Sequence, residues 1–338
     1  MSQGPARGPA HAATGGSGPN ATDGGKGKLD AILGSRKLLF VTGKGGIGKT
    51  LVSVALAQAA AASGRKVLLV ESSSRDQIAP LFGLDPVGHN ETTAAKGIRC
   101  INLTATGNFR EYITKYLGQT KLFETVLSHR VVQSFFNTIP GLAEAMMLGR
   151  LYYTCDVRDE EDRPDLVICD SPASGHFLSL MTTPDAIVGS GLAGPILRDT
   201  EKVRDFLRRK QDVGIIYVCT PEPLVISEAI EFLPEIQEKS PAALCGVIVN
   251  RIPPVVSSKG DFGGVDSMDS MDSRDSLLLD YLRERSGKAN SALDQLRVSM
   301  KKFPGIMFMG LRDLGFVDDP LPAGFYRTFL TEEILNQG

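Results

Sequence analysis

The sequence predicts an α/β fold built on a doubly wound, mostly parallel sheet with an inserted helical subdomain. Short apolar runs recur along the chain, and they are continuous rather than alternating, as in strands that are covered on both faces. Helical stretches lie between several of these runs, and such strand–helix alternation is typical of parallel sheets. In sheets of this kind, ligands bind at the carboxyl ends of the strands.

Seven apolar runs are the expected strands: Leu38–Thr42, Val67–Val70, Ile98–Leu103, Leu166–Cys169, Gly214–Cys219, Leu244–Val249 and Ile306–Met309. A helix is expected over Leu51–Ser63, where Gly64 provides a stop signal. Two long helical stretches, at about residues 105–155 and 174–211, interrupt this rhythm and together form the predicted helical subdomain.

The composition also divides the chain into regions. Residues 1–35 begin with a stretch rich in Gly, Pro, Ala and Ser that has little to bury, and they are predicted to be a disordered tail. Residues 257–276 are rich in Gly, Ser and Asp and are predicted to be a flexible loop, because they lack the Gly and Glu positions of an EF-hand calcium loop. Residues 36–330 are predicted to form a single domain.

The charge balance and the cysteines exclude several classes of protein. There are 37 Lys and Arg residues against 39 Asp and Glu, a net charge of -2, which argues against a nucleic-acid partner. No apolar stretch approaches the ~20 residues of a membrane-spanning helix, so no integral membrane segment is expected. The five cysteines form no CxxC pair, and four of them lie in strand-like runs, which is typical of a reduced, cytoplasmic protein.

A phosphate-binding loop is the strongest signal in the sequence. The segment after the first expected strand fits G-x-x-x-x-G-K-[ST] and directly precedes a helix. Glycines let successive backbone N–H groups approach phosphate oxygens, and the helix N-terminus adds its positive end. Lys49 is expected to reach the β- and γ-phosphates of ATP, and the Thr50 hydroxyl to ligate Mg²⁺. The predicted nucleotide contacts are Gly43, Lys44, Gly45, Gly46, Ile47, Gly48, Lys49 and Thr50.

A second lysine makes this loop more specific. Lys44 stands at the start of the run KGGIGKT, which resembles the deviant Walker A motif of the MinD/ArsA class of ATPases. The resemblance implies that Lys44 crosses a dimer interface and clamps charge on the partner's nucleotide, as an arginine finger does. It therefore implies a homodimer with ATP or ADP at the interface. The plainer interpretation is a solvated loop lysine.

Further motifs resemble the ArsA-type anion-transporting ATPases and the related tail-anchored-protein targeting ATPases. Asp170 opens DSPASGH after an apolar run, similar to the D-T-A-P-T-G-H switch II of that family, and the segment at 139–145, IPGLAEA, resembles its entry into the helical subdomain. The resemblance implies that Asp170 holds Mg²⁺ through water and that Gly175 belongs to a γ-phosphate-sensing loop. Asn250 and Arg251 resemble the family's Asn-Gln pair, whose Asn reads the adenine edge. For both Asp170 and Asn250, the alternative is a cap of the following turn.

One family position is changed. The family's D-P-A-H switch I carries an Asp that orients the attacking water, and Ser73 occupies its place in ESSSRD. A serine hydroxyl can hydrogen-bond the water but cannot accept its proton at neutral pH, and losing a general base costs about 10²–10⁴ in rate. Glu71 and Asp76 are out of register, and exposure to solvent is the expectation for both. The predicted catalytic residues are Lys44, Lys49, Ser73 and Asp170.

In the family, helices above the sheet form an apolar groove that opens with the nucleotide state, and Met side chains suit varied apolar clients. Such stripes belong more often to the core, which is the favoured interpretation for most of these residues. An arsenite pump is not expected, because clustered cysteine thiolates are absent. The candidates for a groove are Phe135, Phe136, Met146, Met147, Leu148, Leu151, Leu178, Leu180, Met181, Ile187 and Leu192.

The predicted function is therefore slow, Mg²⁺-dependent ATP hydrolysis that rearranges a homodimer and controls binding of a hydrophobic protein client. The alternative is a non-hydrolysing, nucleotide-dependent scaffold or regulator, in which Ser73 marks lost catalysis.

Overall fold

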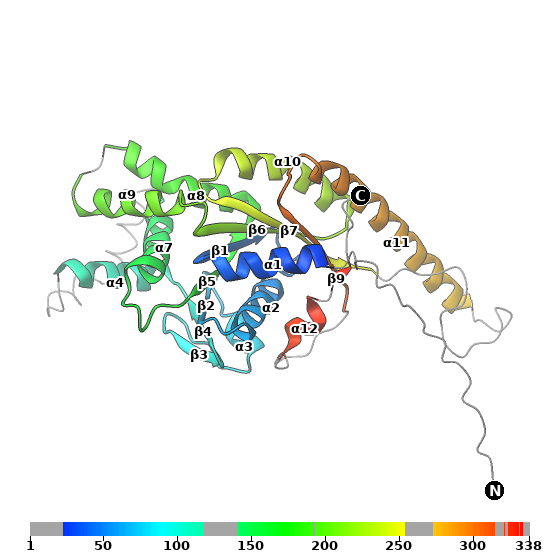
Figure 1. Ribbon diagram of the computed structural model, residues 1–338, viewed down its shortest axis with the longest axis horizontal. Helices are drawn as coiled ribbons and strands as arrows, with labels where there is room; N and C mark the ends of the chain where they lie inside the picture. Colours follow the sequence, from blue (N-terminus) through cyan, green and yellow to red (C-terminus); the bar gives the residue numbers. More distant parts are fainter. Residues whose placement is uncertain are drawn as a thin grey trace, which may run out of the picture.

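The computed structural model describes residues 23–117, 141–191, 193–253, 273–314, 321, 324–330 and 332–333. Within these ranges a nine-stranded sheet has helices on both faces (Figure 1). The strand order is β3-β4-β2-β5-β1-β6-β7-β8-β9, and the strands from β4 to β8 in this order are parallel. The predicted doubly wound, mostly parallel α/β fold is confirmed.

Each expected apolar run corresponds to one parallel strand. Every residue of β1, β2 and β6 is buried, as strands covered on both faces require. The two antiparallel edge strands, β3 (Thr92–Ala95) and β9 (Glu332–Glu333), carry no apolar run, so the sequence does not predict them. The parallel strands are β1 (Leu38–Gly43), β2 (Val67–Glu71), β4 (Ile98–Asn102), β5 (Leu166–Ala173), β6 (Val213–Cys219), β7 (Ala243–Ile252) and β8 (Met307–Arg312).

Two groups of helices cover the sheet. On one face, α2 (Lys49–Ala62) packs against α1 (Asp23–Ser35) and α12 (Phe325–Phe329) (Figure 1). On the other, α10 (Pro223–Lys239) packs against α8 (Ser174–Gly189) and α11 (Ser273–Met300). The short helix α3 (Ile78–Leu81) follows β2 near the edge of the sheet.

A cluster of helices lies at one end of the sheet. α7 (Leu142–Tyr152) packs on α4 (Ala105–Leu117), on α9 (Pro195–Leu207) and on α8, and α8 and α9 also pack on each other (Figure 1). α7 continues directly into a π-helical turn, Tyr153–Val157. These are the described parts of the two predicted helical stretches, and the boundaries of a helical subdomain stay a prediction.

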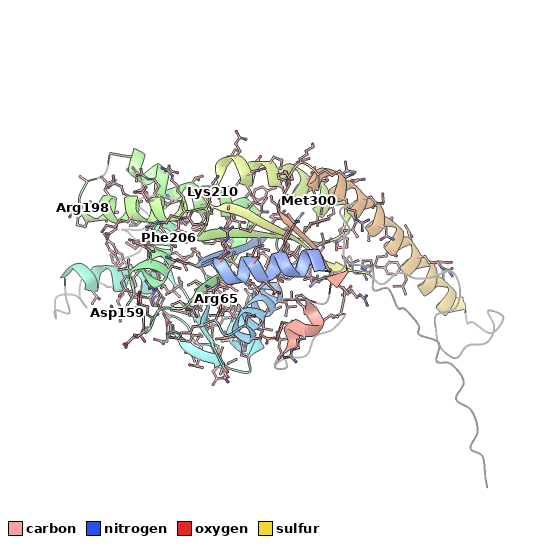
Figure 2. All side chains as sticks on the ribbon, in the orientation of Figure 1. Arg65, Asp159, Arg198, Phe206, Lys210 and Met300 are labelled. Carbon is pink, nitrogen blue, oxygen red and sulfur yellow. The ribbon has the colours of Figure 1, made fainter. Side chains whose placement is uncertain are left out.

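The predicted disordered tail, residues 1–35, is wrong at its C-terminal end. Residues 23–35 form α1, and Leu29 and Leu33 are only 3% and 4% exposed. Arg65, labelled in Figure 2, donates a hydrogen bond to the backbone carbonyl of Leu33 and so holds the end of this helix. The glycine-rich composition of α1 favours a disordered segment, but its apolar residues lie at positions i, i+3 and i+4, the spacing of a buried helical face.

The predicted loop at 257–276 is likewise too long, because α11 begins at Ser273. The first turn of α11, SRDS, has no apolar residue that would mark a helix in the sequence. Residues 1–22 and 257–272 lie outside the described residues, so these parts of both predictions stay open. No helix in the described ranges is long and apolar enough to cross a bilayer. The five cysteines are free and buried.

Candidate nucleotide-binding site

The loop between β1 and α2 leaves the sheet at the carboxyl edge of its central strands. Gly43 lies opposite Val218 of β6 with a φ of +147°, and a Cβ on Gly43 would be 2.0 Å from the Val218 carbonyl oxygen. Only glycine fits this close approach of two backbones. Gly48 caps α2 in the left-handed region, with a φ of +89°. The predicted glycine loop is therefore required by the geometry of the strand-to-helix turn.

Lys49 is fixed inside this loop. Its ammonium group donates a hydrogen bond of 2.9 Å to the backbone carbonyl of Lys44. Burial lowers the pKa of Lys49, and the nearby Asp170 carboxylate opposes this effect. The Lys49 side chain thus links the end of the loop to its beginning and places its ammonium group over the loop.

Asp170 lies in β5 between Val41 of β1 and Glu71 of β2. The Thr50 hydroxyl donates a hydrogen bond of 2.6 Å to Asp170 Oδ2. Asp170 Oδ1 is buried and has no hydrogen-bond partner among the described residues. Burial raises the pKa of Asp170 to about 6, although Thr50 and Lys49 favour the charged form. A buried, unpaired carboxylate oxygen beside a hydroxyl suits a hard cation such as Mg²⁺.

A cavity of about 440 Å³ opens over these residues. This size is within the usual range for small-molecule sites. Its lining residues are Gly46, Gly48, Lys49, Thr50, Glu71, Ser72, Ser73, Gln77, Asp170, Ser171, Pro172, Ala173 and Arg251. The structure thus brings together seven of the predicted site residues: Gly46, Gly48, Lys49, Thr50, Ser73, Asp170 and Arg251. Predicted residues outside this lining are Gly43, Lys44, Gly45, Ile47, Gly175 and Asn250.

Asn250 supports the loop from behind. Its Nδ2 donates a hydrogen bond of 2.8 Å to the backbone carbonyl of Ile47, and its Oδ1 accepts the Arg251 N–H at 2.9 Å. The side chain is buried, and a Cβ on Gly48 would lie 2.5 Å from Nδ2. The amide keeps one further N–H and one further lone pair, so the contact with an adenine edge that the resemblance implies stays a prediction.

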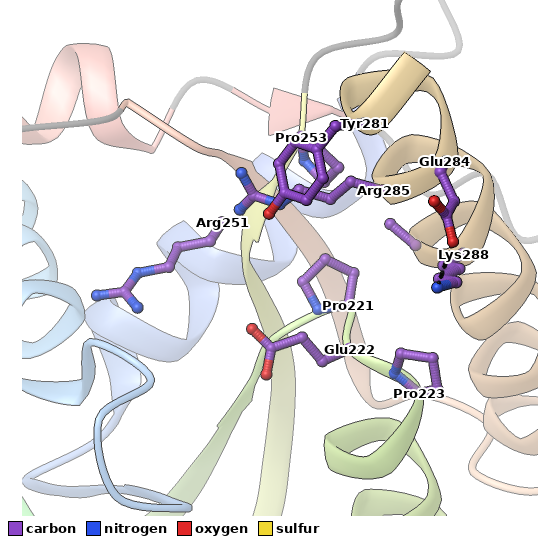
Figure 3. Close-up of a pocket in the computed structure, with 10 residues that line it drawn as sticks. Pro221, Glu222, Pro223, Arg251, Pro253, Tyr281, Glu284, Arg285 and Lys288 are labelled. Atoms are coloured by element: carbon purple, nitrogen blue, oxygen red, sulfur yellow. Dashed lines mark ion pairs between the residues drawn. The ribbon is translucent and has the colours of Figure 1, made fainter. Parts of the chain in front are cut away.

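Arg251 joins this cavity to a second one. Among the described residues it is the one non-glycine with a positive φ, +58°. The second cavity, of about 390 Å³, lies between the β6–α10 turn and α11, and the Arg251 side chain extends from it away from α11 (Figure 3). Arg251 lines both cavities, so this strained residue lies at the boundary between them.

Lys44 does not line the cavity. Its ammonium group lies 2.7 Å from Glu228 Oε1 of α10, within the same chain. The side chains of Lys44 and Glu228 are 40% and 44% exposed. The predicted interpretation as a merely solvated lysine is therefore incomplete, because Lys44 has a specific partner.

The switch I segment differs from its expectation. Glu71 is 2% exposed and lines the cavity, so the expected exposure to solvent is wrong. Its carboxylate accepts hydrogen bonds of 3.0 Å from the backbone N–H groups of Gln77 and Ile78 and from the Ser73 hydroxyl. Burial raises the pKa of Glu71 against these bonds. Asp76 is also held by the protein, since it accepts a bond of 2.6 Å from the Asn102 amide.

Switch II contributes only its first part. Residues 170–173 end β5 and line the cavity, whereas Gly175 and His176 are exposed in the first turn of α8. In this arrangement Gly175 does not contact the cavity, contrary to its predicted place among the nucleotide contacts. The sequence signal for Glu71, Ser171 and Pro172 was only their position beside predicted site residues.

The parallel sheet, the glycine loop at its edge and the Thr50–Asp170 pair define a P-loop NTPase. Residues 36–193 match the family model described as anion-transporting ATPase. ATPase BagA of Mycobacterium tuberculosis is 30% identical over 226 residues, which cover 65% of this chain and 66% of that protein. These similarities support an ArsA-type member of the ATPase family.

Two other relatives align over a shorter part. ATPase ASNA1 homolog 1 of Paramecium tetraurelia is 30% identical over 164 residues, 46% of each chain. An arsenical pump-driving ATPase of Acidiphilium multivorum is 29% identical over 152 residues, 44% of this chain and 25% of that protein. The chain thus spans just under two thirds of the mycobacterial relative and less than half of the other two.

Proposed function

We propose that this protein is an ATPase that binds Mg·ATP in the 440 Å³ cavity and hydrolyses it slowly. The observation that carries the proposal is the unpaired, buried Asp170 Oδ1 beside the Thr50 hydroxyl, at the mouth of a glycine loop that also holds Lys49. The names of the relatives, which are all ATPases, support the same activity.

In this proposal each residue has a separate task. The amide groups of the loop and the first turn of α2 bind the phosphates, because they lack partners inside the helix. Lys49 orients the β- and γ-phosphates. Thr50 and Asp170 would hold Mg²⁺, which supplies neutralisation of the phosphate charge. Hydrolysis is slow because the general base of switch I is replaced by Ser73.

Lys44 acts across a homodimer, and its bond to Glu228 opens when it does so. An ion pair between two partly exposed side chains contributes only about 0–1 kcal/mol. The phosphates of a partner's nucleotide carry several charges and can displace one carboxylate. Charge clamping in trans is therefore compatible with the contact in the single chain.

The proposal also assigns client binding to the helices at the end of the sheet. The described groove candidates are buried, apart from the partly buried Leu178, which favours the core interpretation. Phe135, Phe136 and Leu192 lie outside the described residues. A hydrophobic protein client would need these helices to separate.

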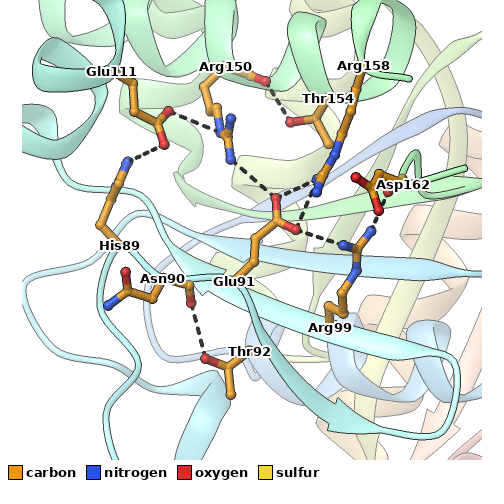
Figure 4. Close-up of polar contacts among 10 residues, drawn as sticks. All are labelled: His89, Asn90, Glu91, Thr92, Arg99, Glu111, Arg150, Thr154, Arg158 and Asp162. Atoms are coloured by element: carbon orange, nitrogen blue, oxygen red, sulfur yellow. Dashed lines mark hydrogen bonds and ion pairs between the residues drawn. The ribbon is translucent and has the colours of Figure 1, made fainter. Parts of the chain in front are cut away.

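A cluster of charges restrains that movement. Glu91 forms ion pairs with Arg99 of β4, with Arg150 of α7 and with Arg158 (Figure 4). Arg150 also contacts Glu111 of α4 at 3.4 Å. Because Glu91 is only 13% exposed, these contacts tie the helical end to the sheet edge more firmly than surface pairs would.

A second candidate is a nucleotide-dependent scaffold that does not hydrolyse ATP, and the observation that favours it is Ser73 in place of a base. Phosphate release separates the two functions. The ATPase releases phosphate with Mg·ATP and loses this activity in Lys49→Ala, whereas the scaffold binds Mg·ATP in calorimetry without release. Absence of any Mg·ATP binding would refute both.

A further inference from the structure

We propose that Ser73 and Glu71 together orient the attacking water, with Ser73 touching the water and Glu71 acting as a positioning residue behind it. This inference rests on the proposed ATPase function. It assigns the task of the missing switch I carboxylate to two side chains instead of one. Glu71 and Ser73 both line the cavity that holds Lys49, Thr50 and Asp170.

The direction of the Ser73 hydroxyl carries the argument. A hydroxyl has one proton to donate and two lone pairs that accept. Ser73 Oγ lies 3.0 Å from Glu71 Oε2 and also within hydrogen-bonding distance of the Arg75 backbone carbonyl. Both neighbours are acceptors, so the proton of Ser73 is committed within the loop. A lone pair of Ser73 Oγ is left to accept a hydrogen from water.

Backbone N–H groups hold the Glu71 carboxylate in the position from which it accepts the Ser73 hydroxyl. Its Oε1 accepts the N–H groups of Gln77 and Ile78 at 3.0 Å, and its Oε2 accepts the Gln77 N–H at 3.0 Å. These bonds compensate the burial of a carboxylate, which is unfavourable without partners. Besides the bond from the Gln77 N–H, Glu71 Oε2 has a second lone pair, which accepts the Ser73 hydroxyl.

The backbone of Ser73 is fixed as well. Asn102 of β4 accepts the Ser73 N–H at 3.1 Å and donates to the Ser73 carbonyl at 3.1 Å. Glu71 itself lies opposite Asp170 in the register of β2 and β5. The Ser73 oxygen is therefore held on the same sheet edge as the residues expected to bind the γ-phosphate.

The step balances without a general base. The water oxygen forms a bond to the γ-phosphorus, and the bond from that phosphorus to the bridging oxygen breaks. ADP leaves with the electron pair, and the proton of the water ends on the released phosphate. Ser73 only directs the water, and positioning of this kind supplies much of the catalysis in phosphoryl transfer.

Steady-state kinetics of single and double variants test the pair. Ser73→Ala and Glu71→Gln should each lower kcat about tenfold, the effect of one hydrogen bond, with KM for ATP changed less than about twofold. In Glu71→Gln the amide nitrogen takes the Oε2 side and donates to Ser73, so one of the two lone pairs of Ser73 Oγ is no longer available to the water. The double variant should be no slower than either single variant, because both remove the same interaction.

A rescue distinguishes positioning from a structural role. Combining Ser73→Asp with Glu71→Gln lets the new amide donate to the new carboxylate, and kcat should return at least to the wild-type value. Ser74→Ala, an exposed neighbour outside the cavity lining, is the matched control and should leave kcat unchanged. Should Glu71→Gln fail to fold, Ser73→Thr decides, since it keeps the hydroxyl and must retain kcat where Ser73→Ala loses it.

Failure of the Ser73–Glu71 proposal can be distinguished from failure of the ATPase proposal. An unchanged kcat in Ser73→Ala, or additive losses near a hundredfold in the double variant, overturns the pair while the ATPase proposal stands. Absence of turnover in the wild type overturns both.

Discussion

The two lysines of the phosphate loop are held in opposite ways. Lys49 bonds to its own loop at 2.9 Å and lies near the half-buried Asp170, so groups of its own chain set its place. Lys44 is partly exposed and pairs at 2.7 Å with Glu228, which belongs to a separate helix. The contrast indicates that Lys49 serves the site of its own chain, whereas Lys44 is available to exchange partners.

The largest effect should come from Lys49→Ala. Removing this charge takes away binding and transition-state stabilisation together, and we expect ATP turnover to fall by more than about 10³. Nucleotide affinity, measured by calorimetry with Mg·ATP, should fall in parallel. Lys202→Ala, on the outside of α9, is the control. Comparable loss in that variant would mean that surface charge and not position matters.

Lys44→Ala should separate the two lysines. We expect Mg·ATP affinity of the single chain to change less than about twofold, while turnover falls about 10² and ATP-dependent dimerisation is lost. Size-exclusion chromatography with light scattering, with and without a non-hydrolysable ATP analogue, measures the dimer. An intact dimer with normal turnover would contradict the proposed role in trans.

The carboxylate beside Lys49 makes the site sensitive to pH. Burial raises the pKa of Asp170 from 3.8 to about 6, so the folded state favours the neutral form. The charged form costs stability above pH 6, and this cost disappears as the pH falls towards 4. Asp170→Asn should therefore raise the free energy of unfolding at pH 7.5 by roughly 1–3 kcal/mol.

Urea unfolding at pH 7.5 and pH 4 would test this, with the difference between the two proteins vanishing at the lower pH. The same variant should lose Mg²⁺-dependent nucleotide affinity, since it lacks the charge. A variant that is destabilised at pH 7.5 would show that burial does not control this carboxylate.

The smallest effect is expected for Glu228→Gln. Freeing Lys44 from an exposed ion pair should tighten ATP-dependent dimerisation by up to about fivefold. The gain should be absent in the Lys44→Ala background, and Glu231→Gln, on the exposed side of the same helix, should have no effect. Weaker dimerisation in Glu228→Gln would instead mean that this carboxylate contacts the partner.

Local signals made much of this molecule predictable. Continuous apolar runs predict the seven parallel strands, because a strand that is covered on both faces is apolar at successive positions of its own sequence. The glycine loop and Thr50 are likewise contiguous in the chain, and Asp170 follows an apolar run. By contrast, burial of Glu71 depends on the N–H groups of a turn that the sequence does not mark.

Other contacts join distant parts of the chain. Asn250 reaches the Ile47 carbonyl across 203 positions, and Lys44 reaches Glu228 across 184. No local pattern of either residue type indicates such a partner, so its identity came only from the structure. The resemblance to a family supplied roles for Asn250 and Lys44 but not these contacts.

The helix before the first strand has a practical consequence for anyone expressing this protein. α1 contacts both α2 and β8, although the family match begins only at residue 36. A chain cut at that boundary would uncover the apolar strip that Leu29 and Leu33 fill and deprive Arg65 of an acceptor. We expect such a fragment to aggregate during purification, and its failure would then be wrongly ascribed to the ATPase domain.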